Sequence, residues 1–203
     1  MSLLRVFLGT PGPLPSRMEF APVRSFLNGW FLRVAKVADA LGAGLTTPQL
    51  RSPFDNVLVQ YTSDSVQLEP QDILIYLVPD RGHSVIRLNV PGFPVDAMGE
   101  GGTTFRASSG QTCSEVYVNH AISWGSRAIA ALAFHEAMHN KTELGNTGGL
   151  NLHSKEGVVL GGYPVSTTSE PSYEDIKLLA TALLERNVPQ WTAGFDLYKG
   201  KFG

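Results

Sequence analysis

The stretch AFHEAMHN, residues 133–140, decides the fold prediction, because two histidines stand four residues apart and a glutamate follows the first. It closes a longer run, SRAIAALAFHEAMHNK (residues 126–141), whose alanine-rich composition favours a helix. Each helical residue turns about 100°, so His135 and His139 project from one face, one turn apart. Glu136 projects about 100° away from His135, beside that face. The spacing predicts two imidazoles able to share one metal ion, with a carboxylate next to them.

The composition fits one globular domain. The chain has 203 residues, of which 43% are hydrophobic, enough for a core, and 17% are charged. A net charge of −2 gives no reason to expect nucleic acid or an anionic membrane as a partner. Cys113 is the single cysteine, so an intrachain disulfide is excluded.

The sequence shows no feature of a membrane or classical export segment. The first sixteen residues carry one arginine and an apolar run broken by Pro11 and Pro13, which does not match a signal peptide. The longest apolar run, residues 128–134, is far below the roughly 18 residues that span a bilayer. We expect a soluble monomer that is cytoplasmic or exported by a non-classical route.

The remaining patterns predict an α+β fold. Helical spacing of apolar residues covers 22–41, Ser126 is the expected N-cap of the histidine-bearing helix, and a third helix covers 172–186. Ser172 and Asp175 stand at capping-box spacing. The predicted strands cover residues 3–9, 56–62, 72–78, 84–90 and 114–120, with a hairpin turn at 79–83 and a loop at 91–112.

The HExxH motif within this order of elements resembles the metzincin clan of zinc peptidases, especially its matrixin-like and serralysin-like members. The family motif, HExxHxxGxxH, uses a glycine to turn the chain toward a third histidine. Here the chain reads HEAMHNKTELGNTGGLNLHS, so the resemblance implies His153 as the third ligand after a looped-out insertion. The glycines that could supply the turn are Gly145, Gly148 and Gly149.

The similarity continues after the third histidine. VVLGGYP (158–164) resembles the segment that carries the Met-turn of the family, and the segment from Tyr173 onward resembles the C-terminal helix of matrixins. The chain departs from the family at the methionine, whose place is taken by Gly161 or Gly162, because Met138 is the last methionine.

The resemblance implies a fold and a set of roles. The fold is a single zincin-like catalytic domain over 1–203, with a sheet subdomain at about 1–140 and a small C-terminal subdomain at about 141–203. It contains a twisted mixed sheet, a long N-terminal helix, an active-site helix and a C-terminal helix. His135, His139 and His153 would bind Zn²⁺, Glu136 would act as general base on zinc-bound water, and Tyr163 would stabilise the oxyanion.

The same resemblance implies the substrate and how it binds. A protein or peptide substrate would pair in extended form with an edge strand, the place that residues 114–120 occupy in the order of elements. The enzyme would be a zinc-dependent endopeptidase, a hydrolase of peptide bonds.

Two other functions remain open. In a gluzincin-like peptidase, Glu170 or Glu174 would replace His153 as the third ligand. In a catalytically inactive zincin fold, the chain would serve as a binding or structural module. His83 and His120 are interpreted as surface or structural histidines, and Cys113 as a small strand residue.

Overall fold

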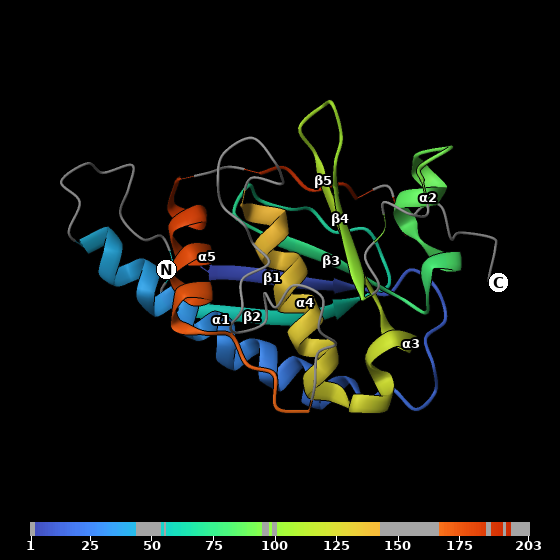
Figure 1. The fold of residues 1–203 in the computed structure, drawn as a ribbon. Helices are drawn as coiled ribbons and strands as arrows, with labels where there is room; N and C mark the ends of the chain where they lie inside the picture. The colour runs from blue at the N-terminus through green and yellow to red at the C-terminus, as the bar shows by residue number, and fades with distance from the viewer. Residues whose placement is uncertain are drawn as a thin grey trace.

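The computed structural model describes residues 3–43, 54, 56–94, 98, 101–142, 167–185, 188–192 and 194–195. These residues form an α+β fold (Figure 1). Its strands are β1 (Leu3–Gly9), β2 (Asn56–Thr62), β3 (Ile73–Val78), β4 (Gly102–Arg106) and β5 (Thr112–Tyr117). Its α-helices are α1 (Phe20–Ala43), α2 (Val85–Asn89), α3 (Val118–Ala121), α4 (Ser126–Lys141) and α5 (Tyr173–Glu185).

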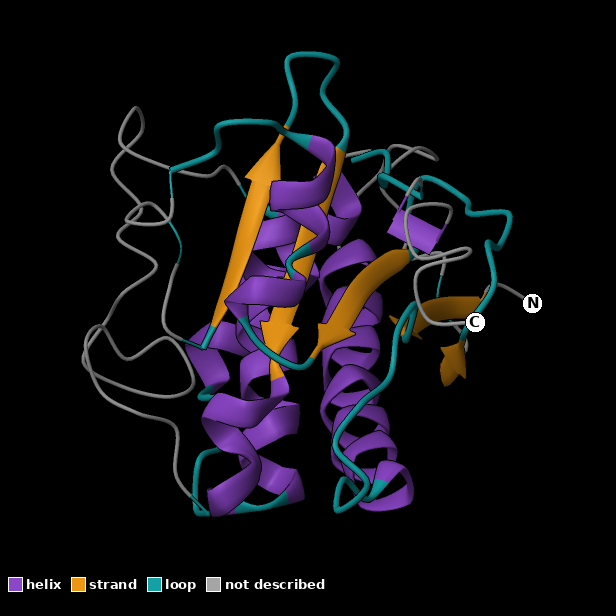
Figure 2. Ribbon diagram, turned by 90° about the vertical axis from the view of Figure 1, so that its right-hand side faces the viewer, coloured by secondary structure: helices purple, strands orange, loops and turns teal. Residues whose placement is uncertain are grey.

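The strands form one mixed sheet in the order β2-β1-β3-β5-β4. β1 pairs in parallel with both β2 and β3, and β3 pairs in parallel with β5. β4 pairs antiparallel with β5, so that Thr104 lies opposite Ser114. The sheet therefore ends in one antiparallel edge strand, and the hairpin between β4 and β5 projects beyond the rest of the molecule (Figure 2).

Helices cover one face of the sheet, and a smaller apolar cluster covers the other. α1, α4 and α5 pack against one another, and α1 and α4 pack against the strands. The larger core joins the inward residues of these helices to alternate residues of β1, β2, β3 and β5, such as Val6, Ile75 and Val116. The other face buries Tyr76 and Tyr117 against α2. Because both faces are covered, the interior strands β3 and β5 are buried throughout.

Several predicted elements have the expected position. The strands at 3–9 and 56–62 have the bounds predicted from the sequence, and the strand predicted at 72–78 is found at Ile73–Val78. The first helix, the histidine-bearing helix and the last helix are all present. The predicted strand at 114–120 is present as β5, but it begins at Thr112 and ends at Tyr117, where the chain enters α3.

The strand predicted at 84–90 is wrong, because this segment is helix α2. The Ser84 hydroxyl accepts a hydrogen bond from the Arg87 backbone N–H at 3.1 Å and so caps the helix. The buried Glu115 carboxylate accepts from the Ile86 N–H at 3.3 Å, which places negative charge at the helix N-terminus. These two interactions outweigh the β-propensity of Val85 and Ile86, and the hairpin turn expected at 79–83 is replaced by a short 3₁₀ turn at Arg81–His83.

Two further predictions are wrong, one about the edge strand of the sheet and one about the start of α4. The loop predicted at 91–112 contains β4, so β4 is the edge strand and residues 114–117 lie inside the sheet, between β3 and β4. Pairing with β5 gives the polar and glycine-rich stretch its strand structure. Ser126 is the first residue of α4 rather than its N-cap, a position taken by Gly125 with φ 84°. This left-handed backbone favours glycine.

The capping box of α5 is formed as predicted and gives a test of helix stability. The Ser172 hydroxyl accepts from the Asp175 N–H at 3.1 Å, and the Asp175 carboxylate accepts from the Ser172 N–H at 2.8 Å. Ser172→Ala is expected to lower the free energy of unfolding by about 1 kcal/mol, measured by urea titration. Thr181→Ala removes an exposed hydroxyl from the same helix and is the control. Equal stability of the two variants would contradict the capping role.

No helix among the described residues is long and apolar enough to cross a membrane.

Candidate metal centre

Helix α4 packs against β4 and β5 and carries the candidate metal ligands (Figure 1). Most of its residues are buried, including Phe134 and Met138. The helix ends at Thr142, whose backbone N–H and hydroxyl both donate to the Met138 carbonyl, at 2.9 and 2.6 Å. Packing on several sides thus holds a helix whose alanine-rich sequence already favours this conformation.

His135 and His139 lie together on the half-buried side of α4. Their Nε2 atoms are 2.9 Å apart and their ring centroids 4.5 Å apart. Two nitrogens at this distance cannot both point a hydrogen at each other, so at least one Nε2 offers a lone pair. The arrangement is the one that the four-residue spacing predicts.

The separation of the two nitrogens suits a shared zinc ion. Zinc–nitrogen bonds of about 2.0–2.1 Å in a tetrahedral arrangement place two imidazole nitrogens about 3.3 Å apart. The observed 2.9 Å separation differs from this by less than about half an ångström, which small rotations of the two rings would supply. His135 and His139 therefore fit as two ligands of one metal ion.

Glu136 points from α4 toward the edge strand and is only 3% exposed. Its Oε2 accepts a hydrogen bond from the Thr104 hydroxyl at 2.6 Å. A Cβ added at Gly102 would lie 2.6 Å from Glu136 Oε1, so the absence of a side chain there makes room for the carboxylate. β4 therefore covers the glutamate through Gly102 and Thr104.

Burial dominates the electrostatics of this carboxylate. Desolvation raises the pKa of Glu136 to about 8, the Thr104 hydrogen bond opposes that rise, and the charge of Glu115 adds to it. A cation held by the adjacent histidines would favour the ionised form. Glu136 is therefore a buried carboxyl whose proton affinity depends strongly on the charges and hydrogen bonds around it.

The two remaining predicted site residues, His153 and Tyr163, lie outside the described residues, as do Gly145, Gly148 and Gly149. Within the described ranges, no group of three or more His, Cys, Asp or Glu side chains could hold a metal ion.

The two glutamates of the gluzincin alternative lie elsewhere in the part of the chain that the structure describes. Glu170 forms ion pairs with Arg33 and with Arg127, both at 2.8 Å. Arg127 lies in the first turn of α4, about 12 Å along the helix from His135. Glu174 is exposed on the first turn of α5.

The other histidines and the cysteine occupy structural positions. His83 Nδ1 lies 2.9 Å from Asp80 Oδ1, and the His120 ring packs edge-on against Trp124. Cys113 is 2% exposed in β5, and burial raises the pKa of its thiol well above the ordinary value. A buried thiol held in its protonated form is a poor nucleophile.

Sequence analysis did not identify four polar residues that connect to Glu136. They are Thr104, Ser114, Asn140 and Gln190, which are joined by hydrogen bonds. The β-propensity of the Thr-Thr-Phe sequence at 103–105 was the available signal for a strand at Thr104. Gln190 carries no local signal, because the contacts that join it to this group and to β3 come from Asn140 and Leu74, at least fifty positions away in the chain.

A second buried carboxylate lies on the opposite face of the sheet. Glu115 is fully buried and accepts hydrogen bonds from the Ser84 and Tyr117 hydroxyls and the Ile86 N–H. Burial raises the pKa of Glu115, and these hydrogen bonds oppose the rise. Three donors from α2 and β5 indicate a structural role, which joins α2 to the sheet.

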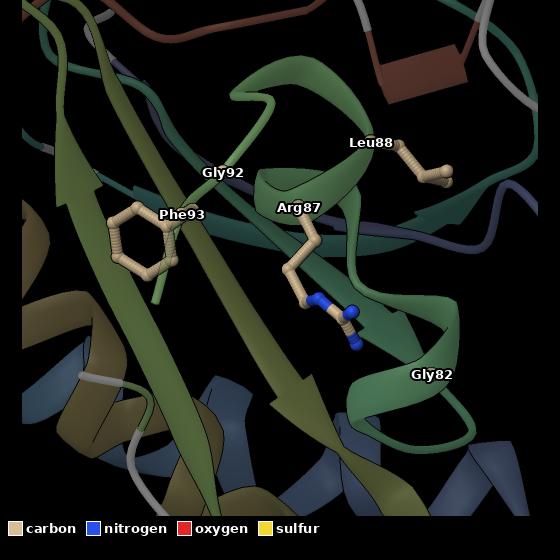
Figure 3. Close-up of a pocket in the computed structure, with 5 residues that line it drawn as sticks. All are labelled: Gly82, Arg87, Leu88, Gly92 and Phe93. Carbon is tan, nitrogen blue, oxygen red and sulfur yellow. The ribbon is translucent and has the colours of Figure 1, made fainter. Parts of the chain in front are cut away.

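A pocket of about 240 Å³ also lies on this opposite face (Figure 3). It is lined by Gly82, Arg87, Leu88, Gly92 and Phe93. The Phe93 ring packs against Phe105 of β4, which points away from α4. Neither His135 nor His139 lines this pocket.

Comparisons of this chain with protein families, with curated proteins and with solved structures give no match.

Proposed function

We propose that this protein is a zinc-dependent endopeptidase of metzincin-like type. The approach of His135 and His139 to 2.9 Å beside the buried Glu136 is the observation that carries the proposal. The order of elements supports it, because a strand, a long helix and further strands, among them the edge strand β4, come before the histidine-bearing helix.

The chemistry of the site follows from these groups. His135, His139 and His153 would hold the ion, and bound zinc supplies a Lewis acid that polarises a carbonyl and lowers the pKa of water to about 7. Glu136 takes a proton from the attacking water while the oxygen of that water bonds to the peptide carbonyl carbon. The same carboxyl then gives that proton to the amine nitrogen as the C–N bond breaks. Tyr163 would donate a hydrogen bond to the developing oxyanion.

The edge strand provides a place for an extended substrate. β4 ends the sheet order, and its backbone pairs with β5 on one side. A peptide added to the other side would gain main-chain hydrogen bonds, the recognition mode known as β-augmentation. This proposal replaces residues 114–120 with β4 as the substrate-binding strand.

The inactive-module alternative is less well supported by the environment of Glu136. A fully buried carboxyl whose pKa is raised by desolvation lowers stability at neutral pH, and a neutral side chain of similar shape would avoid that cost. A module that needed only the fold would be more stable without this residue. Retaining it suits a protein that uses the proton affinity of Glu136.

Metal stoichiometry tests the ligand set. We expect the purified protein to hold one zinc ion per chain and to cleave casein, with activity lost to a chelator and restored by zinc. His153→Ala should lower the zinc content below half an ion per chain, because two histidines alone bind weakly. His83→Ala is the matched control.

Three outcomes distinguish the alternatives. Full zinc retention in His153→Ala would favour the gluzincin ligand set. Zinc-free protein after mild purification would contradict the metal centre. Zinc without cleavage of casein or a peptide library would favour the binding module.

A further inference from the structure

A row of buried hydrogen bonds runs from the C-terminal segment to the Glu136 carboxylate. The backbone N–H of Leu74 donates to Gln190 Oε1 at 3.2 Å. The Gln190 and Asn140 side-chain amides then bind each other through two hydrogen bonds of 2.8 and 3.0 Å. From Asn140 the row continues to Ser114 Oγ at 2.9 Å, to Thr104 Oγ1 at 2.8 Å and to Glu136 Oε2 at 2.6 Å.

The Leu74 N–H fixes the orientation of the two amides. A backbone N–H can only donate, so the Gln190 atom facing it is the oxygen. The Gln190 Nε2 therefore donates to the Asn140 oxygen, and also to the Val188 carbonyl at 2.9 Å. The Asn140 Nδ2 in turn donates one hydrogen to Gln190 and the other to Ser114.

The same reasoning orients the two hydroxyls. Ser114 Oγ accepts from Asn140, so its hydrogen is available for Thr104 Oγ1, the closest acceptor at 2.8 Å. Thr104 then accepts from Ser114 and directs its own hydrogen to Glu136 Oε2. From Asn140 onward, one donor of each residue points toward Glu136, and the carboxylate is the final acceptor.

We propose that Thr104, oriented by Ser114 and Asn140, is a positioning residue that holds Glu136 by Oε2 and leaves Oε1 to take the proton. The inference rests on the proposed peptidase function. Oε1 is the oxygen beside Gly102, where an added Cβ would lie 2.6 Å from it. Oε2 is held by a hydroxyl on a strand that is itself paired with β5.

This arrangement joins the base to the strand proposed for substrate binding. Thr104 belongs to β4, so the strand that would pair with an extended peptide also orients Glu136. A substrate that shifts β4 would shift the carboxylate with it. The position of the base thus depends on the edge strand as well as on α4.

Steady-state kinetics of the zinc-loaded protein test the role. Thr104→Val keeps the shape of the side chain and removes the donor. We expect kcat to fall about 10- to 100-fold, with KM and zinc content changed less than about threefold. Thr104→Ser restores the hydroxyl and should recover kcat to within about threefold of the wild type. The matched control is Thr103→Val, the same change on the neighbouring residue, whose hydroxyl faces Tyr117 on the other side of the sheet.

A double-mutant cycle on the melting temperature of the metal-free protein tests the same contact without a measurement of activity. Thr104→Val should lower the melting temperature, and the shift should shrink by at least half when Glu136→Leu has already removed the acceptor. Additive shifts, or an unchanged kcat in an active Thr104→Val protein, would overturn the positioning role. If the wild type cleaves no peptide, the proposed function fails, and the cycle alone decides whether Thr104 holds Glu136.

Discussion

Replacing Glu136 by glutamine is expected to lower kcat/KM for peptide cleavage about 10²- to 10⁴-fold while the protein retains its zinc. Glutamine keeps the shape of the side chain and an oxygen for the Thr104 hydroxyl, but it cannot take a proton at neutral pH. General-base catalysis contributes typically this factor. Metal analysis and peptide-cleavage kinetics on the same preparation provide the measurement.

The same substitution is expected to stabilise the metal-free protein. The pKa of Glu136 is about 8 in the fold against 4.5 as the reference value. Between these values the folded state holds a proton that the unfolded chain has released, so the free energy of unfolding falls as pH rises through this range. Glu136→Gln should remove this dependence. The gain at pH 8 should be on the order of 4 kcal/mol.

An exposed glutamate provides the control. Glu19 stands just before α1 and is exposed, so Glu19→Gln makes the same change of charge away from the site. It should not alter kcat/KM. A Glu136→Gln protein that cleaves peptides at the wild-type rate would rule out Glu136 as the base. Parallel wild-type and variant stability curves between pH 4.5 and 8 would contradict the raised pKa.

Truncating Phe134 is expected to lower the free energy of unfolding by about 3–5 kcal/mol. Its side chain is fully buried next to the first zinc-ligand candidate. The ring packs edge-on against Trp30, with centroids 6.1 Å apart, and tilted against Phe31 at 5.2 Å. Phe134→Ala would leave a cavity between α1 and α4 that these aromatic rings cannot fill. Urea titration of metal-free protein gives the change.

Phe20→Ala is the comparison, because Phe20 is 37% exposed and packs on Tyr61 at the surface. Phe20→Ala should lower the free energy of unfolding by less than half as much as Phe134→Ala does. Similar losses for Phe134→Ala and Phe20→Ala would mean that the contact between α1 and α4 contributes little to stability. Phe134→Leu, which keeps most of the apolar volume, should lie between Phe134→Ala and the wild type.

The sequence predicts the elements whose signals are local. The alternation and apolar content of 3–9 and 56–62, and the stripe within 22–41, specify elements that the structure contains. Residues 84–90 have an equally strong strand pattern but form α2. The Ser84 cap is a local contact, but the second stabilising contact is with Glu115, about thirty positions away, and no local pattern contains it. The strand at 102–106 likewise depends on pairing with β5.

The candidate site likewise has one part that the sequence predicts and one part that it does not. The approach of His135 and His139 follows from helical geometry and was predictable to within one turn. The burial of Glu136 and its contact with Thr104 depend on which strand lies over α4, and strand order is a property of the whole sheet. The position of a ligand pair is therefore readable from sequence, whereas the environment that sets the proton affinity of the neighbouring base is not.

The pairing of β1 has a consequence for how quickly this chain folds. Leu3 pairs with Asn56 and Val6 with Ile73, so both partner strands of β1 are more than fifty residues away from it in the sequence. Non-local parallel pairings give a high contact order and folding times of milliseconds to seconds, whereas a helix forms in about a microsecond. The rate-limiting event should therefore be assembly of the sheet around β1, with the turn that holds both histidines formed long before it.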